Sequence, residues 1–282
     1  MRLVTFLRQG YVEPGILDGA QVLPLEHIDT LVDFIALAPE ERAAVRTNAP
    51  LPLASVVLLA PVVPRKNVFC VGRNYLGHAE EVARARGSEL KLPGVPTFFT
   101  KAPTSITGPE AVLQLSPAIS QQYDWEAELA VVIGKRCRDV PKDRAHDVIF
   151  GYTCLNDVTA RDLQNAHVQW FKGKSLDQAC PMGPWIVSAD EIPDPQALHV
   201  TMRVNGEIKQ DASTAAMIFP IAEIIASLSA GMTLEPGDVI ATGTPEGVGF
   251  ARTPPEFLKN GDVMEVEIER IGLLRNSVAL TE

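Results

Sequence analysis

Hydrophobic residues along this 282-residue chain fall in short runs that are bounded by Gly, Pro, Asn or Asp. Runs of this length, rich in β-branched and aromatic residues, are typical of strands. From Asn67 onward they dominate the sequence, as NVFCVG, TFFTK, ELAVVIGK, VIFGYTCLN, GPWIVS, HVTMRVNG, DVIATG and VMEVEIERIG. Because they do not alternate regularly with helical segments, the pattern predicts a β-dominated α+β fold rather than a βαβ repeat.

Helical patterns are fewer. The best are LGHAEEVARARG, VTARDLQNA and IFPIAEIIASLSAG, and in the last of these Gly231 is placed to end the helix. Residues 1–62 combine short alternating runs with an amphipathic stretch, LVDFIALAPEERAAV, and a proline-rich exit. We therefore expect a small N-terminal α/β domain over residues 1–62, with one helix, and a larger catalytic domain over residues 63–282.

The charge balance excludes some partners. Acidic residues number 35 and basic residues 25, which gives a formal net charge of -10, so a sequence-independent grip on nucleic-acid phosphates is disfavoured. The longest nearly apolar run, Val56 to Val63, is interrupted by Pro61 and is far shorter than the ~18 residues of a membrane span. The N-terminal residues lack the pattern of a signal peptide. We expect a cytoplasmic protein with neither nucleic acid nor membrane as a partner.

Two glutamates begin an apolar strand in YDWEAELAVVIGK. Glu126 and Glu128 are two residues apart, so their side chains project from one face of the strand. An exposed, solvated face is the simpler interpretation of such a pair. However, the next apolar segment also runs into an acid, Asp157. Three hard oxygen donors with no histidine pair nearby suit Mg²⁺ or Mn²⁺ better than zinc.

A histidine and a glutamate lie three residues apart in GRNYLGHAEE. On a helix, His78 and Glu81 are close enough to hydrogen bond, whereas Glu80 points elsewhere and is expected to be solvated. Such a dyad can hold a water molecule and take its proton near neutral pH. A surface ion pair is the competing interpretation.

Basic and glycine-rich segments add candidate ligands for an anion. Lys172 and Lys174 flank a glycine in an otherwise apolar stretch, and one of them could face an anionic ligand, although an exposed loop would look the same. GTPEGVG offers backbone amides and the Thr244 hydroxyl, but it lacks the spacing of a nucleotide-binding loop. The four cysteines show no CxxC spacing and are expected to be buried free thiols, and the other four histidines are expected to be structural or superficial.

Taken together and in this order, the segments CVGRNYLGHAEE, DWEAELAVVIGK, GYTCLNDVTARDLQ, KGKSLDQACPMGPW and GDVIATGTPEGVG resemble the fumarylacetoacetate hydrolase family. The resemblance covers about residues 67 to 280 and implies a mixed β-sandwich roll that is commonly dimeric, so we expect a homodimer. It also implies the following roles: Mg²⁺ or Mn²⁺ ligands at Glu126, Glu128 and Asp157, a lid dyad at His78 and Glu81, and substrate-facing groups at Arg73, Gln164, Lys174 and Thr244. Lys172 does not align with the family's lysine.

The resemblance implies a small 2-oxo acid as substrate. The first expectation is a metal-dependent hydrolase that cleaves a C–C bond in a β-diketo acid of the acylpyruvate or fumarylpyruvate type. In such an enzyme His78, oriented by Glu81, would activate water, while Lys174 would help to stabilise the oxyanion or enolate. The alternative is an isomerase, hydratase or oxaloacetate-type decarboxylase that acts on 2-oxo diacids. A non-catalytic metal-binding protein is the remote alternative, disfavoured because the set of functional residues is complete.

Overall fold

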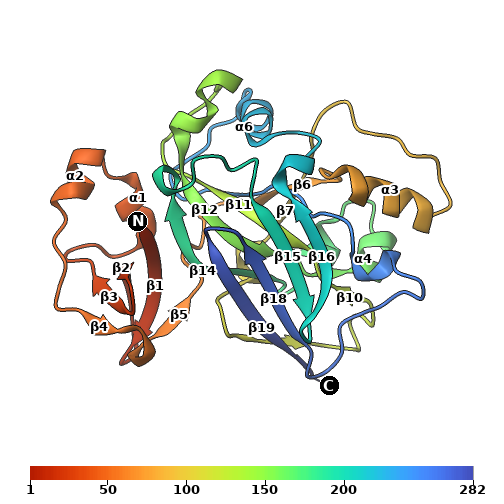
Figure 1. Cartoon of the computed structure of the whole chain (residues 1–282), viewed down its shortest axis with the longest axis horizontal. Coiled ribbons are helices and arrows are strands. Elements are labelled where there is room, and N and C mark those ends of the chain that lie inside the picture. The colour runs from red at the N-terminus through yellow and green to blue at the C-terminus, as the bar shows by residue number, and fades with distance from the viewer. Residues whose placement is uncertain (282) are drawn as a thin grey trace.

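The computed structural model describes residues 1–281, which form three β-sheets and a few short helices (Figure 1). The central sheet has twelve strands, a second sheet has five, and two short strands form the third. The β-dominated α+β class predicted from the sequence is therefore confirmed.

The central sheet is mixed, and most of its neighbouring strands are antiparallel. Its main path is β4 (Leu51–Pro52), β3 (Gln21–Pro24), β2 (Tyr11–Asp18), β1 (Arg2–Arg8), β14 (Cys180–Ser188), β12 (Ile149–Asn156), β11 (Ala127–Ile133), β17 (Val239–Ala241), β6 (Val68–Gly72) and β7 (Thr97–Lys101). In addition, β5 (Val57–Leu59) pairs with β1, and β8 (Ile106–Thr107) pairs with β14. The parallel pairs are β6 with β17 and β8 with β14.

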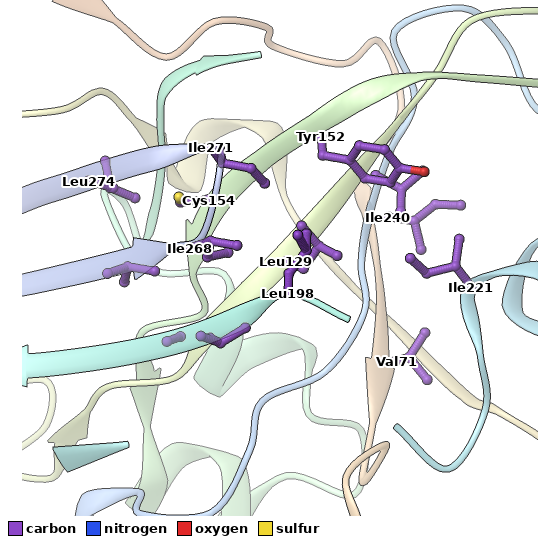
Figure 2. Packing of buried hydrophobic residues seen from close by; sticks show 14 of the residues in the cluster. Val71, Leu129, Tyr152, Cys154, Leu198, Ile221, Ile240, Ile268, Ile271 and Leu274 are labelled. Atoms are coloured by element: carbon purple, nitrogen blue, oxygen red, sulfur yellow. The ribbon is translucent and has the colours of Figure 1, made fainter. Parts of the chain in front are cut away.

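The second sheet packs against the central one. Its order is β16 (Glu207–Ser213), β15 (His199–Val204), β18 (Val263–Ile268), β19 (Gly272–Leu280) and β9 (Val112–Leu115). The two-stranded sheet joins β10 (Tyr123–Asp124) to β13 (Thr159–Ala160). Figure 2 shows part of the core between the large sheets, where Leu129 and Tyr152 of the central sheet belong to one buried cluster with Ile268 and Leu274 of the second.

Strand β11 is buried on both faces, which explains its nearly unbroken apolar sequence. Leu129, Val131 and Ile133 belong to the core shared with the second sheet. The intervening residues, Ala130 and Val132, belong to a separate core on the opposite face. Because side chains alternate along a strand, β11 is fixed between two cores at once.

The N-terminal region continues the central sheet. Strand β1 pairs with β14 in antiparallel register, with Arg2 opposite Val187. Helices α1 (Leu31–Ala36) and α2 (Pro39–Ala44) lie in this region (Figure 1), and α1 contributes buried side chains to the core that also contains Val68. The division into residues 1–62 and 63–282 stays a prediction. In the structure the two parts share a sheet and a core.

The single helix predicted over residues 31–45 is wrong, because α1 and α2 are separate. Pro39 begins α2, and a proline has no amide hydrogen for a continuing helix and clashes with the preceding turn. The helix predicted over VTARDLQNA is shorter than expected, since its first residues form β13 and only Arg161–Ala166 form α4.

The remaining helices are also short. They are α3 (Leu76–Ala85), α5 (Phe171–Lys174) and α6 (Ile221–Ser229). Single 3₁₀ segments occur at residues 53–55, 103–105, 142–148, 189–191, 214–216 and 249–251. Within residues 1–281, no helix combines the length and apolar character that crossing a bilayer requires.

Candidate metal centre and active site

Three carboxylates meet where β11 begins and β12 ends. These strands pair in antiparallel register with Ala127 opposite Asn156, so the acids at the start of one strand lie beside the acid that follows the other. The backbone amide of Asp157 also donates to the carbonyl of Glu126 at 2.8 Å. As a result, Glu126, Glu128 and Asp157 are all buried and each offers an oxygen within 4.8 Å of the others.

Three buried cations surround these carboxylates. The Lys174 ammonium donates to Glu126 Oε2 at 2.8 Å and to Asp157 Oδ2 at 2.7 Å. Lys101 donates to Asp157 Oδ1 at 2.7 Å, and Arg161 Nη1 lies 2.6 Å from Glu126 Oε1. The sequence analysis missed Lys101 and Arg161. The available signal for Lys101 was a lysine that ends the apolar strand TFFTK.

Glu128 differs from Glu126 and Asp157 because no cationic side chain within residues 1–281 contacts it. One of its oxygens accepts from the backbone amide of Gly243 at 2.8 Å. Burial, together with the nearby Asp157 and Glu126 carboxylates, raises the pKa of Glu128 well above its usual range. Burial acts in the same direction on Glu126, but Lys174 and Arg161 outweigh it and lower the pKa of Glu126 to about 2.

These carboxylates fit a divalent cation. A buried carboxylate without a cationic partner must take up a proton or a metal ion. Three clustered carboxylates supply the hard oxygen ligands that Mg²⁺ and Mn²⁺ prefer. Carboxylate oxygens can accept more than one bond, so the contacts to Lys174, Lys101 and Arg161 leave capacity for a metal.

The His78–Glu81 dyad lies on helix α3 and is buried. His78 Nδ1 and Glu81 Oε1 are 2.8 Å apart, and the other carboxylate oxygen of Glu81 accepts from the Gly247 amide at 2.8 Å. Because an ionised carboxylate only accepts, the proton of this bond belongs to Nδ1, which leaves Nε2 free to take a proton. Glu80 is exposed, as predicted.

The glycine-rich segment after β17 is shaped by contacts with its neighbours. Gly243 has a φ of +103° and its α-carbon faces the Asn74 side chain, where a Cβ would lie 2.7 Å from Asn74 Cβ, so only glycine fits. The Thr244 hydroxyl donates to the Ala127 carbonyl and accepts from Gln210. This hydroxyl therefore anchors the loop to the strand that carries the two glutamates.

Asp124 ties three parts of the site together. Its Oδ1 accepts from the amides of Trp125 at 2.8 Å and Gly249 at 2.7 Å. Its Oδ2 accepts from the Phe250 amide at 3.0 Å and from Arg161 Nε at 2.8 Å. Asp124 thus fixes Arg161 relative to the glycine-rich segment. The sequence analysis missed it, since an aspartate next to two other acids gives no sign of its partners.

A small cavity of about 40 Å³ lies between α3 and the carboxylates. Its lining includes seven of the nine predicted site residues: Arg73, His78, Glu126, Glu128, Gln164, Lys174 and Thr244. The other two, Glu81 and Asp157, are bonded directly to His78 and Lys174. Lys172 is exposed and lies outside this set. Arg161 also lines the cavity, and its Nη2 is buried with no hydrogen-bond partner within the described residues.

Comparison with known proteins gives this arrangement a family. The sequence model described as "Fumarylacetoacetate (FAA) hydrolase C-terminal" matches residues 67–279, about three quarters of the chain. The chain belongs to this family. The resemblance seen in the sequence is confirmed, and so is the family's fold: the structure described as "Fumarylacetoacetate hydrolase (EaFAH) from psychrophilic Exiguobacterium antarcticum" matches with a TM-score of 0.84 and 40% identity, covering 100% of both chains.

Two similar members of the fumarylacetoacetate hydrolase family carry an isomerase name. "Oxaloacetate tautomerase YisK" of Bacillus subtilis is 50% identical over 80% of this chain and 74% of its own length. "Oxaloacetate tautomerase Fahd2a, mitochondrial" of Rattus norvegicus is 40% identical over 99% of this chain and 91% of its own length. The protein is therefore a family enzyme with an acidic metal site, and these relatives favour the isomerase alternative over C–C hydrolysis.

Proposed function

We propose that this protein is a divalent-metal-dependent tautomerase that interconverts the enol and keto forms of a small 2-oxo diacid, with oxaloacetate as the first candidate substrate. The observation that carries the proposal is a buried carboxylate cluster that shares one small cavity with a histidine–glutamate dyad, in a chain similar to two oxaloacetate tautomerases.

The proposed metal ligands are Glu126, Glu128 and Asp157, with Mg²⁺ or Mn²⁺ as the ion. A cation bound there would supply positive charge that stabilises the enolate relative to the neutral enol. Lys174 is placed to bind the 2-oxo carboxylate end of the substrate beside the metal, because its ammonium bridges two of these carboxylates. Arg161 Nη2, which has no hydrogen-bond partner within residues 1–281, and the Gln164 amide offer further hydrogen bonds to substrate oxygens.

His78 is the proposed acid and base. Tautomerisation removes the proton from the enol hydroxyl and adds one to the adjacent carbon, so it breaks no bond between heavy atoms. His78 Nε2 can take the first proton and return it at carbon, while Glu81 holds the ring in place through its bond to Nδ1. The small volume of the cavity leaves little room for water beside a substrate.

Hydrolysis remains the second candidate, because the same dyad could activate a water molecule and a solved structure 40% identical to this chain is described as a hydrolase. It requires a nucleophilic water and a substrate tail, beyond what enol–keto exchange needs. Assays with the two classes of substrate separate the two reactions.

The test compares three reactions with one enzyme preparation. Decay of the enol absorbance of oxaloacetate is followed with Mg²⁺, with Mn²⁺ and after treatment with EDTA, against the rate in buffer alone. We expect acceleration that needs the metal. Acylpyruvate cleavage and release of CO₂ from oxaloacetate are measured in parallel. Faster cleavage or decarboxylation than tautomerisation would replace the proposal, and acceleration of none of the three would remove it.

The homodimer and the metal identity also stay predictions. Light scattering of the purified protein tests the first. Calorimetry with oxalate, which mimics a bound enolate, tests the metal. We expect oxalate to bind in the presence of Mg²⁺ or Mn²⁺ and not after EDTA treatment, and the affinities with the two ions compare them.

A further inference from the structure

Arg86 follows directly after α3, the helix that carries the proposed acid and base. His78, Val82 and Arg86 are spaced by four residues and form one stripe along this helix, and all three line the cavity that contains the carboxylates. Arg86 lies about 12 Å further along the helix axis than His78. Because helical side chains lean toward the N-terminus, its guanidinium reaches back over the cavity.

Arg86 also lacks an anionic partner. Within residues 1–281 neither Arg86 nor Arg73 forms an ion pair, whereas Arg161 is neutralised by Asp124 and by a glutamate of the carboxylate cluster. Among the described residues, the side chain of Arg86 donates only to Asn165 Oδ1, at 3.3 Å. Burial, Arg73 and Arg161 lower the pKa of Arg86. Within residues 1–281, Arg73 and Arg86 therefore contribute two guanidinium groups without ion-pair partners to the cavity lining.

We propose that Arg86, with Arg73 beside it, binds the second carboxylate of a dicarboxylate substrate and so selects diacids over 2-oxo monoacids. The inference rests on the proposed function, in which the 2-oxo carboxylate end of the substrate lies beside Lys174 and the metal site of Glu126, Glu128 and Asp157. The other end then faces the opposite side of the cavity. A guanidinium offers paired N–H donors that match a carboxylate, and two unpaired guanidinium groups repel each other until an anion lies between them.

Calorimetry on the Mg²⁺-loaded enzyme tests this with two ligands. Oxalate presents only the end that would bind near the metal. The second ligand, 3,3-difluorooxaloacetate, adds the second carboxylate and cannot form an enol. We expect Arg86→Gln to weaken binding of difluorooxaloacetate by about 10- to 30-fold, the usual range for losing a charged hydrogen bond, and to change oxalate binding by less than about twofold.

Arg84→Gln is the matched control. Arg84 has the same charge and lies on the same helix, but it is outside the cavity lining and forms no ion pair within the described residues. We expect the control to change the binding of either ligand by less than about twofold. Arg86→Lys, which keeps the charge but not the paired donors, should fall between the wild type and Arg86→Gln.

Two results would overturn the assignment. Equal losses for both ligands in Arg86→Gln would mean that Arg86 acts by holding the helix through Asn165 rather than by binding the second carboxylate. Equal effects of Arg84→Gln and Arg86→Gln would mean a general effect of charge. The two proposals fail separately. If the enzyme lacks tautomerase activity but binds difluorooxaloacetate through Arg86, only the proposed function is wrong. If the enzyme is active but the Arg86→Gln variant binds difluorooxaloacetate normally, only this inference is wrong.

Discussion

Replacement of Asp124 by asparagine tests how the site is held together. The carboxylate of Asp124 accepts four hydrogen bonds, from Trp125 and Gly249 at one oxygen and from Phe250 and Arg161 at the other. Asparagine has nearly the same shape but replaces one oxygen with an NH₂ group. Whichever way this amide is turned, its NH₂ faces two N–H donors.

The size of the effect follows from these four bonds. Burial raises the pKa of Asp124 even though Arg161 and two backbone amides act against it, so loss of the charge by itself removes little stability. The cost comes from two buried donors without an acceptor, at about 1–3 kcal/mol each. We therefore expect Asp124→Asn to lower the free energy of unfolding by roughly 2–6 kcal/mol.

Urea denaturation of the metal-free protein, followed by tryptophan fluorescence, measures this change. Asp143→Asn is the control, because Asp143 is exposed and makes no side-chain hydrogen bond or ion pair within the described residues. It should remain within about 0.5 kcal/mol of the wild type. An Asp124→Asn variant within 1 kcal/mol of the wild type would contradict the reasoning, since its four donors would then not depend on the carboxylate.

Three further substitutions probe the proposed acid and base, the metal site and the cavity wall. His78→Ala should lower kcat for tautomerisation by at least about 100-fold because it removes the proposed acid and base, while Glu80→Gln, on the exposed side of the helix, should leave kcat unchanged. Glu128→Gln should weaken Mn²⁺ binding by at least about tenfold, because a neutral amide is a poorer ligand than a carboxylate. Electron paramagnetic resonance measures the affinity for Mn²⁺, and an unchanged affinity would mean that Glu128 is not a ligand. Gly72→Ala should raise KM, because a Cβ there would overlap the ring of Trp170 in the cavity wall; steady-state kinetics with an unchanged KM would show that the wall yields freely.

The strands and the acidic ligands could be predicted from sequence because their signals are local. Glu126 and Glu128 are two residues apart where an apolar strand begins, so they share one face, and the end of the next apolar run marks Asp157. The structure adds the antiparallel register that brings these two strand ends together. From the sequence alone the three acids were candidate ligands of one ion, and this strand pairing shows why they meet.

Lys174 could be predicted from its motif, but Lys101, Arg161 and the supporting residues could not, because their partners are distant in sequence. Lys101 lies 56 residues from Asp157, and Gln210 lies 34 residues from Thr244. A lysine at a strand end and a glutamine within a strand look like ordinary surface residues. Their burial follows from how the sheets cross, which no local pattern records. Hydrolysis was the first expectation and isomerisation the alternative, and the similar oxaloacetate tautomerases favour the alternative. The sequence could not rank the two reactions, since a histidine–glutamate dyad serves water activation and proton exchange equally well.

The burial of β11 between two cores has a consequence for how such enzymes change. The proposed metal ligands begin a strand that cannot shift without repacking both faces, whereas the end of α3 and residues 86–92 are exposed. Mutations that accumulate during divergence are therefore tolerated at the lid and resisted at the metal. New substrates should arise by exchange of the segment formed by the end of α3 and residues 86–92, while the metal site stays unchanged. Grafting that segment between relatives is the natural way to engineer substrate selectivity.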